Sequence, residues 1–159
     1  MFREMRRIKQ ELPLEEAKSL LMKNKRGVLS FNGEDDYPYA IPINFLYDEE
    51  ENKIYFHGAK TGYKLDCIKK KNNKACFVTY GDQELSENGW SYYLKSIVAF
   101  GEIEIIEDRD LAAKKLIELA SRYFPSMEEI NEVMERSFKN ALVFSLNIQH
   151  MTCKKVHEK

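Results

Sequence analysis

The residues best suited to chemistry lie at positions 55–66, in the run YFHGAKTGYKLD. Gly58 and Gly62 permit tight backbone turns at the point where a strand gives way to a helix. Lys60 and Lys64 flank the first turn of that helix, where the helix dipole already places positive charge. A phosphate among the free backbone N–H groups would relieve the mismatch, so the run indicates an anion site. The alternative is that both lysines point into solvent.

His57, just before the first of these glycines, is the candidate catalytic acid or base, because imidazole titrates near neutral pH. The alternative is that it only positions a ligand at the end of a strand. His150 and His157 stand far from it in the sequence, and there is no HExxH pattern and no paired thiol. No metal site is therefore predicted.

A proline inside an apolar run marks a second candidate segment. Residues 37–47 are typical of a strand, but Pro42 removes one ladder donor and indicates a bulge or a sheet edge. A bulge would leave backbone groups free to bind a planar ligand. An edge strand in which Pro42 blocks further strand pairing is the alternative.

A third candidate is the pair Lys95 and Ser96, within an apolar strand expected at 92–106. An ammonium group and a hydroxyl group together suit phosphate oxygens. In the alternative interpretation the strand is half-exposed, Lys95 lies at the surface and Ser96 is a spacer.

Composition excludes several classes of protein. The chain has 159 residues, with 25 Lys and Arg against 26 Asp and Glu, whereas general nucleic-acid binders carry a basic excess. The longest uncharged stretch, 37–47, is too short to span a bilayer. Glycine-rich nucleotide loops and the Gly-x-Ser-x-Gly hydrolase elbow do not occur. The length fits one domain over residues 1–159.

The N-terminal sequence MFREMRRIKQEL is charged and has no apolar signal core. Three cysteines without a CxxC pair fit a reducing compartment. We therefore expect the protein to act in the cytoplasm.

The elements that position these candidates follow from hydrophobic periodicity and from cap residues. Strands are predicted at 28–31, 37–47, 53–57, 75–80, 92–106 and from 142 to 149. Helices are predicted at 13–27, 61–71, after the cap Asp108 and over 126–139, with a turn at 32–36 and a polar loop at 82–91. Six strands with mostly short connections predict a mainly β (α+β) fold, an antiparallel barrel with flanking helices.

Taken together, these segments resemble the pyridoxamine 5′-phosphate oxidase-like, FMN-binding split-barrel family, and within it the nitroimidazole-resistance branch. The resemblance runs from about Gly27 to Lys155. It rests on GVLS, DDYPYAIPINFLYD, IYFHGAKTGYKLD, SIVAFGEIEII and MTCKK, in that order. It implies a six-stranded split barrel.

The resemblance also implies an FMN site built from three segments. The residues along the isoalloxazine ring would be Pro42, Ile43, Asn44 and Phe45. Those at the ring and the ribityl chain would be His57, Gly58 and Ala59. Lys64 would bind the 5′-phosphate, with Lys60 and Gly62 beside it. Further phosphate contacts would come from Ser96 and Ile97, and Lys95 stands where many relatives carry arginine.

Members of this family are homodimers with two flavin sites at the subunit interface, so we expect a homodimer, with helix 126–139 contributing from the partner chain. The C-terminal sequence MTCKKVHEK does not reproduce the oxidase's arginine and histidine substrate segment, so pyridoxamine phosphate oxidase activity is not expected. The resemblance implies an FMN oxidoreductase that takes electrons from a small-molecule donor and reduces a small, electron-poor, nitroimidazole-like acceptor. The alternatives are a non-enzymatic flavin-binding module and a haem-binding split barrel with His57 as the axial ligand.

Overall fold

The computed structural model describes residues 2–34, 37–69 and 72–157. The helices are α1 (Leu14–Lys23), α2 (Tyr63–Ile68), α3 (Arg109–Ala120) and α4 (Met127–Ser137), with short 3-10 turns η1 (Ile8–Gln10) and η3 (Phe138–Asn140). The strands are β1 (Glu11–Leu12), β2 (Arg26–Asn32), β3 (Pro38–Asn44), β4 (Leu46–Asp48), β5 (Lys53–Ala59), β6 (Lys74–Leu85), β7 (Tyr92–Ile105) and β8 (Ala141–His157).

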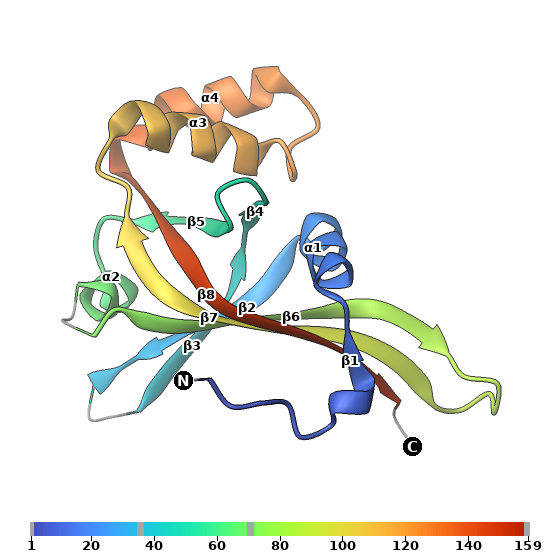
Figure 1. The fold of residues 1–159 in the computed structure, drawn as a ribbon. Helices are drawn as coiled ribbons and strands as arrows, with labels where there is room; N and C mark the ends of the chain where they lie inside the picture. The colour runs from blue at the N-terminus through green and yellow to red at the C-terminus, as the bar shows by residue number, and fades with distance from the viewer. Residues whose placement is uncertain (1, 35–36, 70–71, 158–159) are drawn as a thin grey trace.

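The strands form one antiparallel sheet in the order β3-β2-β6-β7-β8-β5-β4, with β1 paired to β8. The first and last strands of this order, β3 and β4, are consecutive in the chain and are separated only by Phe45. The curled sheet is thus a barrel left open along one seam (Figure 1). This confirms the predicted antiparallel split barrel with flanking helices.

The described residues form eight strands where the sequence predicted six, for two reasons. The two-residue β1 is too short to give a periodic signal. The strand predicted at 37–47 is divided at Phe45 into β3 and β4, which lie at opposite ends of the sheet order.

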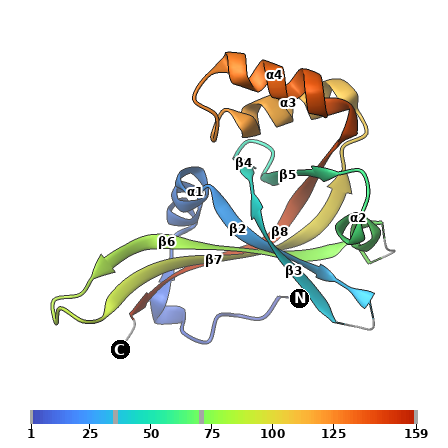
Figure 2. The same ribbon diagram turned by 180° about the vertical axis from the view of Figure 1, so that it is seen from behind.

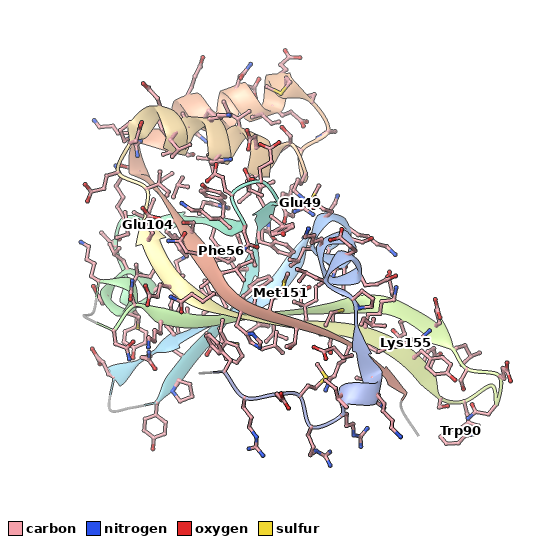
Figure 3. All side chains as sticks on the ribbon, in the orientation of Figure 1. Glu49, Phe56, Trp90, Glu104, Met151 and Lys155 are labelled. Carbon is pink, nitrogen blue, oxygen red and sulfur yellow. The ribbon has the colours of Figure 1, made fainter. Side chains whose placement is uncertain are left out.

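Aromatic side chains fill the barrel. Phe56 stacks on Phe144 with ring centroids 5.3 Å apart, and Phe45 meets Phe77 edge-on at 4.8 Å. All four are fully buried, and Figure 3 shows Phe56 inside the curled sheet. Helix α1 contributes Ala17, Leu20 and Leu21 to the same core.

The two late helices begin where their caps predict. The carboxylate of Asp108 accepts hydrogen bonds from the backbone N–H groups of Asp110 and Leu111, and the hydroxyl of Ser126 accepts one from Glu129. Helices α3 and α4 lie side by side above β4 and β5 (Figures 1 and 2).

Two predicted strand ends were wrong. Strand β6 continues to Leu85, into the predicted loop 82–91, after a bulge between Gly81 and Glu84. Strand β8 reaches His157, well beyond 149. The β6–β7 hairpin extends beyond the core, with Trp90 at its tip (Figure 3), so burial imposes no alternation on its sequence there.

Helix α2 is shorter than the predicted 61–71. Positions 70 and 71 of that expected helix, and positions 35 and 36 of the expected turn, lie outside the described residues. Within the described ranges, no helix is long and apolar enough to cross a bilayer. No cluster of three or more His, Cys, Asp or Glu side chains in the same ranges could hold a metal ion.

Candidate functional site

The site begins where β5 ends. His57, Gly58 and Ala59 pair with the first residues of β8, and the chain then turns at Gly62 into α2. Gly62 has a φ of 105°, a conformation that a side chain would strain. Its carbonyl accepts the N–H groups of Leu65 and Asp66, which starts the helix and carries Lys64 back over β5.

Lys64 is a half-buried cation without a carboxylate partner among the described residues. A Cβ atom on Gly58 would lie 2.4 Å from its Nζ, so the ammonium group lies directly over this glycine. Nζ lies 5.6 Å from the centroid of the Phe144 ring. No ion pair to Lys64 is formed by any of the residues that the structure describes. Burial lowers the pKa of this amine.

His57 lies beside Lys64 and lines a cavity. Desolvation lowers the pKa of its imidazole, and the positive charge of Lys64 lowers it further. The imidazole is therefore neutral near pH 7, and it can donate or accept a hydrogen bond there.

The cavity lies between the barrel wall and the helices α3 and α4 and has a volume of about 280 Å³. Its polar lining residues are Asn44, His57, Tyr123 and Ser137. The remaining lining side chains are apolar: Leu116, Leu119, Ala120, Phe124, Ile130, Val133, Met134, Phe138 and Ala141. The structure thus brings two predicted residues, Asn44 and His57, to one cavity.

The segment around Pro42 is an edge strand. Strand β3 pairs with β2 in continuous register from Pro38 to Asn44, so Pro42 marks an edge and the alternative interpretation is confirmed. The bulge, the other interpretation of Pro42, does not occur, and the strand breaks three residues later at Phe45. Ile43 is half-buried and packs against the core.

The break at Phe45 is held by the residues that follow α3. The backbone N–H of Phe45 donates to the hydroxyl of Tyr123 at 3.1 Å, and its carbonyl accepts from Arg122 Nη1 at 3.0 Å. Arg122 also donates to the carbonyls of Met22 and Asn24, and Tyr123 to that of Lys25. These side chains replace strand pairing at the seam.

Lys60 and Arg109 hold the chain after α4. Lys60 Nζ donates to the carbonyl of Lys139 at 2.7 Å. Arg109 donates to the carbonyls of Phe138 and Ala141, and its guanidinium lies 4.0 Å from the Phe138 ring centroid. Lys60 therefore stabilises a turn and does not join Lys64.

The third predicted segment lies elsewhere in the chain. Ser96 pairs with Lys154 of β8, whereas His57 pairs with Val143. The eleven steps along β8 from Val143 to Lys154 span roughly 35 Å of extended strand. One chain therefore does not bring Ser96 to His57.

The neighbours of Ser96 are likewise engaged elsewhere. Lys95 Nζ forms ion pairs with Glu16 at 2.8 Å and Asp82 at 3.4 Å, and the hydrogen bond to Glu16 raises its pKa. Ile97 is fully buried in the core.

Sequence reasoning expected helix 126–139 to contribute to the flavin site from the partner chain, but it named as site residues none of those of α3 and α4 that line the cavity within one chain. A usable signal was present in α4, where Ile130, Val133, Met134, Ser137 and Phe138 follow helical spacing along one face.

Comparisons with known proteins agree with this architecture. The sequence profile of the pyridoxamine 5′-phosphate oxidase family matches residues 13–155. No curated protein matches the chain. A solved structure of a candidate 5-nitroimidazole antibiotic resistance protein from Bacteroides thetaiotaomicron is 20% identical, with a TM-score of 0.79 over 92% of this chain and 87% of that chain.

Two further solved structures share the fold. An FAD and haem binding protein from Mycobacterium smegmatis is 21% identical, with a TM-score of 0.72 over 92% of this chain and 72% of that chain. An FAD-binding protein from Mesorhizobium loti is 19% identical, with a TM-score of 0.63 over 92% and 97%.

Proposed function

The chain belongs to the pyridoxamine 5′-phosphate oxidase family, and from this premise we propose that it is an FMN-binding oxidoreductase that reduces a small, electron-poor acceptor. The flavin in the names of two structural neighbours supports the cofactor. The 5-nitroimidazole in the name of a third supports the type of acceptor.

The observation that best supports this proposal is the environment of the Lys64 ammonium group. Its ammonium group is half-buried, has no carboxylate partner among the described residues and lies over Gly58. A phosphate dianion there would supply the missing negative charge through charge-assisted hydrogen bonds. Because Lys60 is bound to the Lys139 carbonyl, one phosphate group suits the site better than a pyrophosphate, which favours FMN over FAD.

The other residues expected to hold the cofactor lie on two adjoining segments. The edge-strand residues Pro42, Ile43 and Asn44 would lie along a ring, whereas the backbone of Phe45 is bound by Tyr123 and Arg122. His57, Gly58, Ala59 and Gly62 would lie between the ring and Lys64. A bound flavin supplies the redox chemistry, whereas the protein supplies position and electrostatics.

His57 is suited to orient ligands. A neutral imidazole at the cavity wall offers one N–H donor and one acceptor beside an otherwise largely apolar lining. Proton delivery by His57 to the acceptor is the competing role.

We propose that the protein is a homodimer. Val28, Val78 and Val98 are register partners on β2, β6 and β7, and their half-exposed side chains form an apolar band on one sheet face beside Phe100. The N-terminal residues cover part of this face, where Phe2 stacks on Phe100. A second copy of the chain, packed on this band, would bury the rest of the apolar sheet face. The segment Lys95–Ile97 of that second copy would then lie near the proposed FMN site.

Two other functions would use the same pocket. A non-enzymatic flavin-binding module would bind FMN without turnover. A haem protein with His57 as axial ligand is favoured by the haem in one neighbour's name. We propose that the protein acts in the cytoplasm, which its three free cysteines support.

The absorption spectrum of the purified protein tests the proposal. Flavin bands, with release of FMN on denaturation identified by chromatography, would support it. A haem Soret band would favour the haem protein. A colourless protein that does not take up added FMN would contradict the flavoprotein and the haem protein alike.

A further inference from the structure

Helix α4 has an apolar stripe that is only partly buried against the rest of the protein. Ile130, Val133 and Met134 lie on one face of the helix and line the cavity, yet only Ile130 is buried. A surface helix normally covers such a stripe by packing it on the core. Here the stripe faces about 280 Å³ of space.

The lining of the cavity is uncharged and largely apolar. Its lining contains no Lys, Arg, Asp or Glu among the described residues, and its one titratable base, His57, is neutral because its pKa is lowered. Asn44 and His57 come from the barrel strands, while the side chains from α4 are apolar apart from Ser137. A charged molecule would lose its hydration there without gaining a partner.

The cavity is also distinct from the place argued for the phosphate. Lys64 lies over Gly58 and Phe144 and does not line the cavity, whereas His57 belongs to both surroundings. A ligand in the cavity would therefore lie next to a flavin without occupying its phosphate site.

We infer that the cavity under α4 binds the second substrate, and that this substrate is a small, uncharged, largely apolar aromatic molecule. Helix α4 is then the element that determines specificity, because its stripe forms one wall of the cavity. This inference rests on the proposed function for the identity of the neighbouring cofactor, but the binding itself does not require the cofactor.

The probes are nitrobenzene, 4-nitrobenzoate and 4-nitrobenzamide, of which the last two have the same size and shape and differ by one negative charge. In FMN-loaded protein, where the phosphate engages Lys64, we expect nitrobenzene and the amide to bind at least about tenfold more tightly than the carboxylate in an NMR titration. Equal affinity, or preference for the carboxylate, would overturn the inference.

A pair of variants locates the binding. Val133→Asp places a carboxylate on the cavity side of α4, and Asn131→Asp places the same group on its exposed side. Val133→Asp should weaken nitrobenzene binding by about tenfold or more, and Asn131→Asp should leave it unchanged. Ala120→Leu, which narrows the cavity without adding charge, should weaken it as well if Val133→Asp fails to fold.

Two further measurements separate this inference from the proposed function. Nitrobenzene titrated into flavin-free protein should give the same order of variants even if FMN never binds. Conversely, loss of FMN affinity in Val133→Asp or Ala120→Leu would show that the cavity holds the flavin ring, and would overturn the inference while leaving the flavoprotein proposal intact.

Discussion

The hydroxyl of Tyr123 is the hydrogen-bonding partner that the backbone of Phe45 lacks within the sheet. Tyr123 comes 78 residues later in the chain, after the end of α3, and it also lines the cavity beside Asn44. The same side chain therefore closes the barrel seam and forms part of the site. The geometry of the cavity depends on the seam.

Tyr123→Phe should destabilise the fold by about 1–2 kcal/mol, because the buried N–H of Phe45 and the carbonyl of Lys25 lose their partner. Chemical denaturation measures this change. Tyr37→Phe is the control, because Tyr37 is 76% exposed, and it should leave the midpoint in place. Equal midpoints for both variants would mean that water replaces the hydroxyl at the seam.

Lys64→Ala should weaken FMN binding by roughly 1.5–3 kcal/mol, which is a tenfold to hundredfold loss of affinity. Stability without FMN should change little, because Lys64 forms no ion pair with the residues described. A flavin titration followed by fluorescence gives the constants, with the exposed Lys69→Ala as control. An unchanged affinity would remove the argument for the phosphate site.

Lys115 is 3% exposed on α3, and it pairs with Asp48 at 2.5 Å and Glu51 at 3.2 Å. Lys115→Met would leave Asp48 without its cation and Glu51 with only the more distant Lys53 at 3.9 Å. Because those carboxylates are partly exposed, we expect a loss of roughly 2–3 kcal/mol, below the cost at a fully buried pair. Lys114→Met, on the exposed side of α3, is the matched control.

The same cluster should show in the pH dependence of unfolding. Burial alone would raise the pKa of Asp48, but hydrogen bonds from Lys115 and from the backbone of Glu51 outweigh it and lower the pKa below its ordinary 3.8. A lowered carboxyl pKa stabilises the fold above the unfolded value, and this contribution is lost as the pH falls through the folded value. Urea titrations below about pH 4 should therefore show a steeper loss in the parent than in Lys115→Met.

His57→Gln should retain FMN and should change both half-reactions by less than about threefold if His57 only positions ligands. Its lowered pKa favours this outcome, since a neutral imidazole and an amide both donate one hydrogen bond. Stopped-flow absorbance measures reduction by the donor and reoxidation by the acceptor separately. A selective loss of roughly a hundredfold in reoxidation would instead assign proton delivery to His57.

Light scattering should give about twice the chain mass of 18.7 kDa. Val98→Asp, in the apolar band beside Phe100, should shift this mass toward that of the monomer and weaken FMN binding. Thr152 is the β8 register partner of Val98 at the end of the row, so Thr152→Ser is a mild control on the same face. A monomeric parent that binds FMN would contradict the proposed shared site.

The parts of the fold that sequence predicted are those governed by local interactions. Asp108 and Ser126 cap helices through backbone groups two and three residues away, so their signals are readable along the chain. The break at Phe45 was not readable, because it lies within a continuous apolar run and its partners, Arg122 and Tyr123, are distant in sequence.

The candidate site divides in the same way. The run that carries His57, Gly58 and Lys64 is contiguous, and the structure brings these three residues together. Ser96 was grouped with them by family resemblance, and within one chain the register of β8 separates them. The apolar stripe of α4 was visible in the sequence, but only the tertiary arrangement shows that it faces a cavity.

The hydrogen bonds from Lys60 and Arg109 give α4 a fixed end and a looser end. Both cations bind carbonyls just after the helix, at Phe138, Lys139 and Ala141. At the other end, among the described residues, the side-chain hydrogen bond is the Ser126 cap, which lies within the helix's own first turn, and the first buried side chain is that of Ile130. Amide exchange should therefore be fastest in the residues before Ile130 and slower from there to Ser137, so that the end nearest Ser126 opens first when a ligand enters.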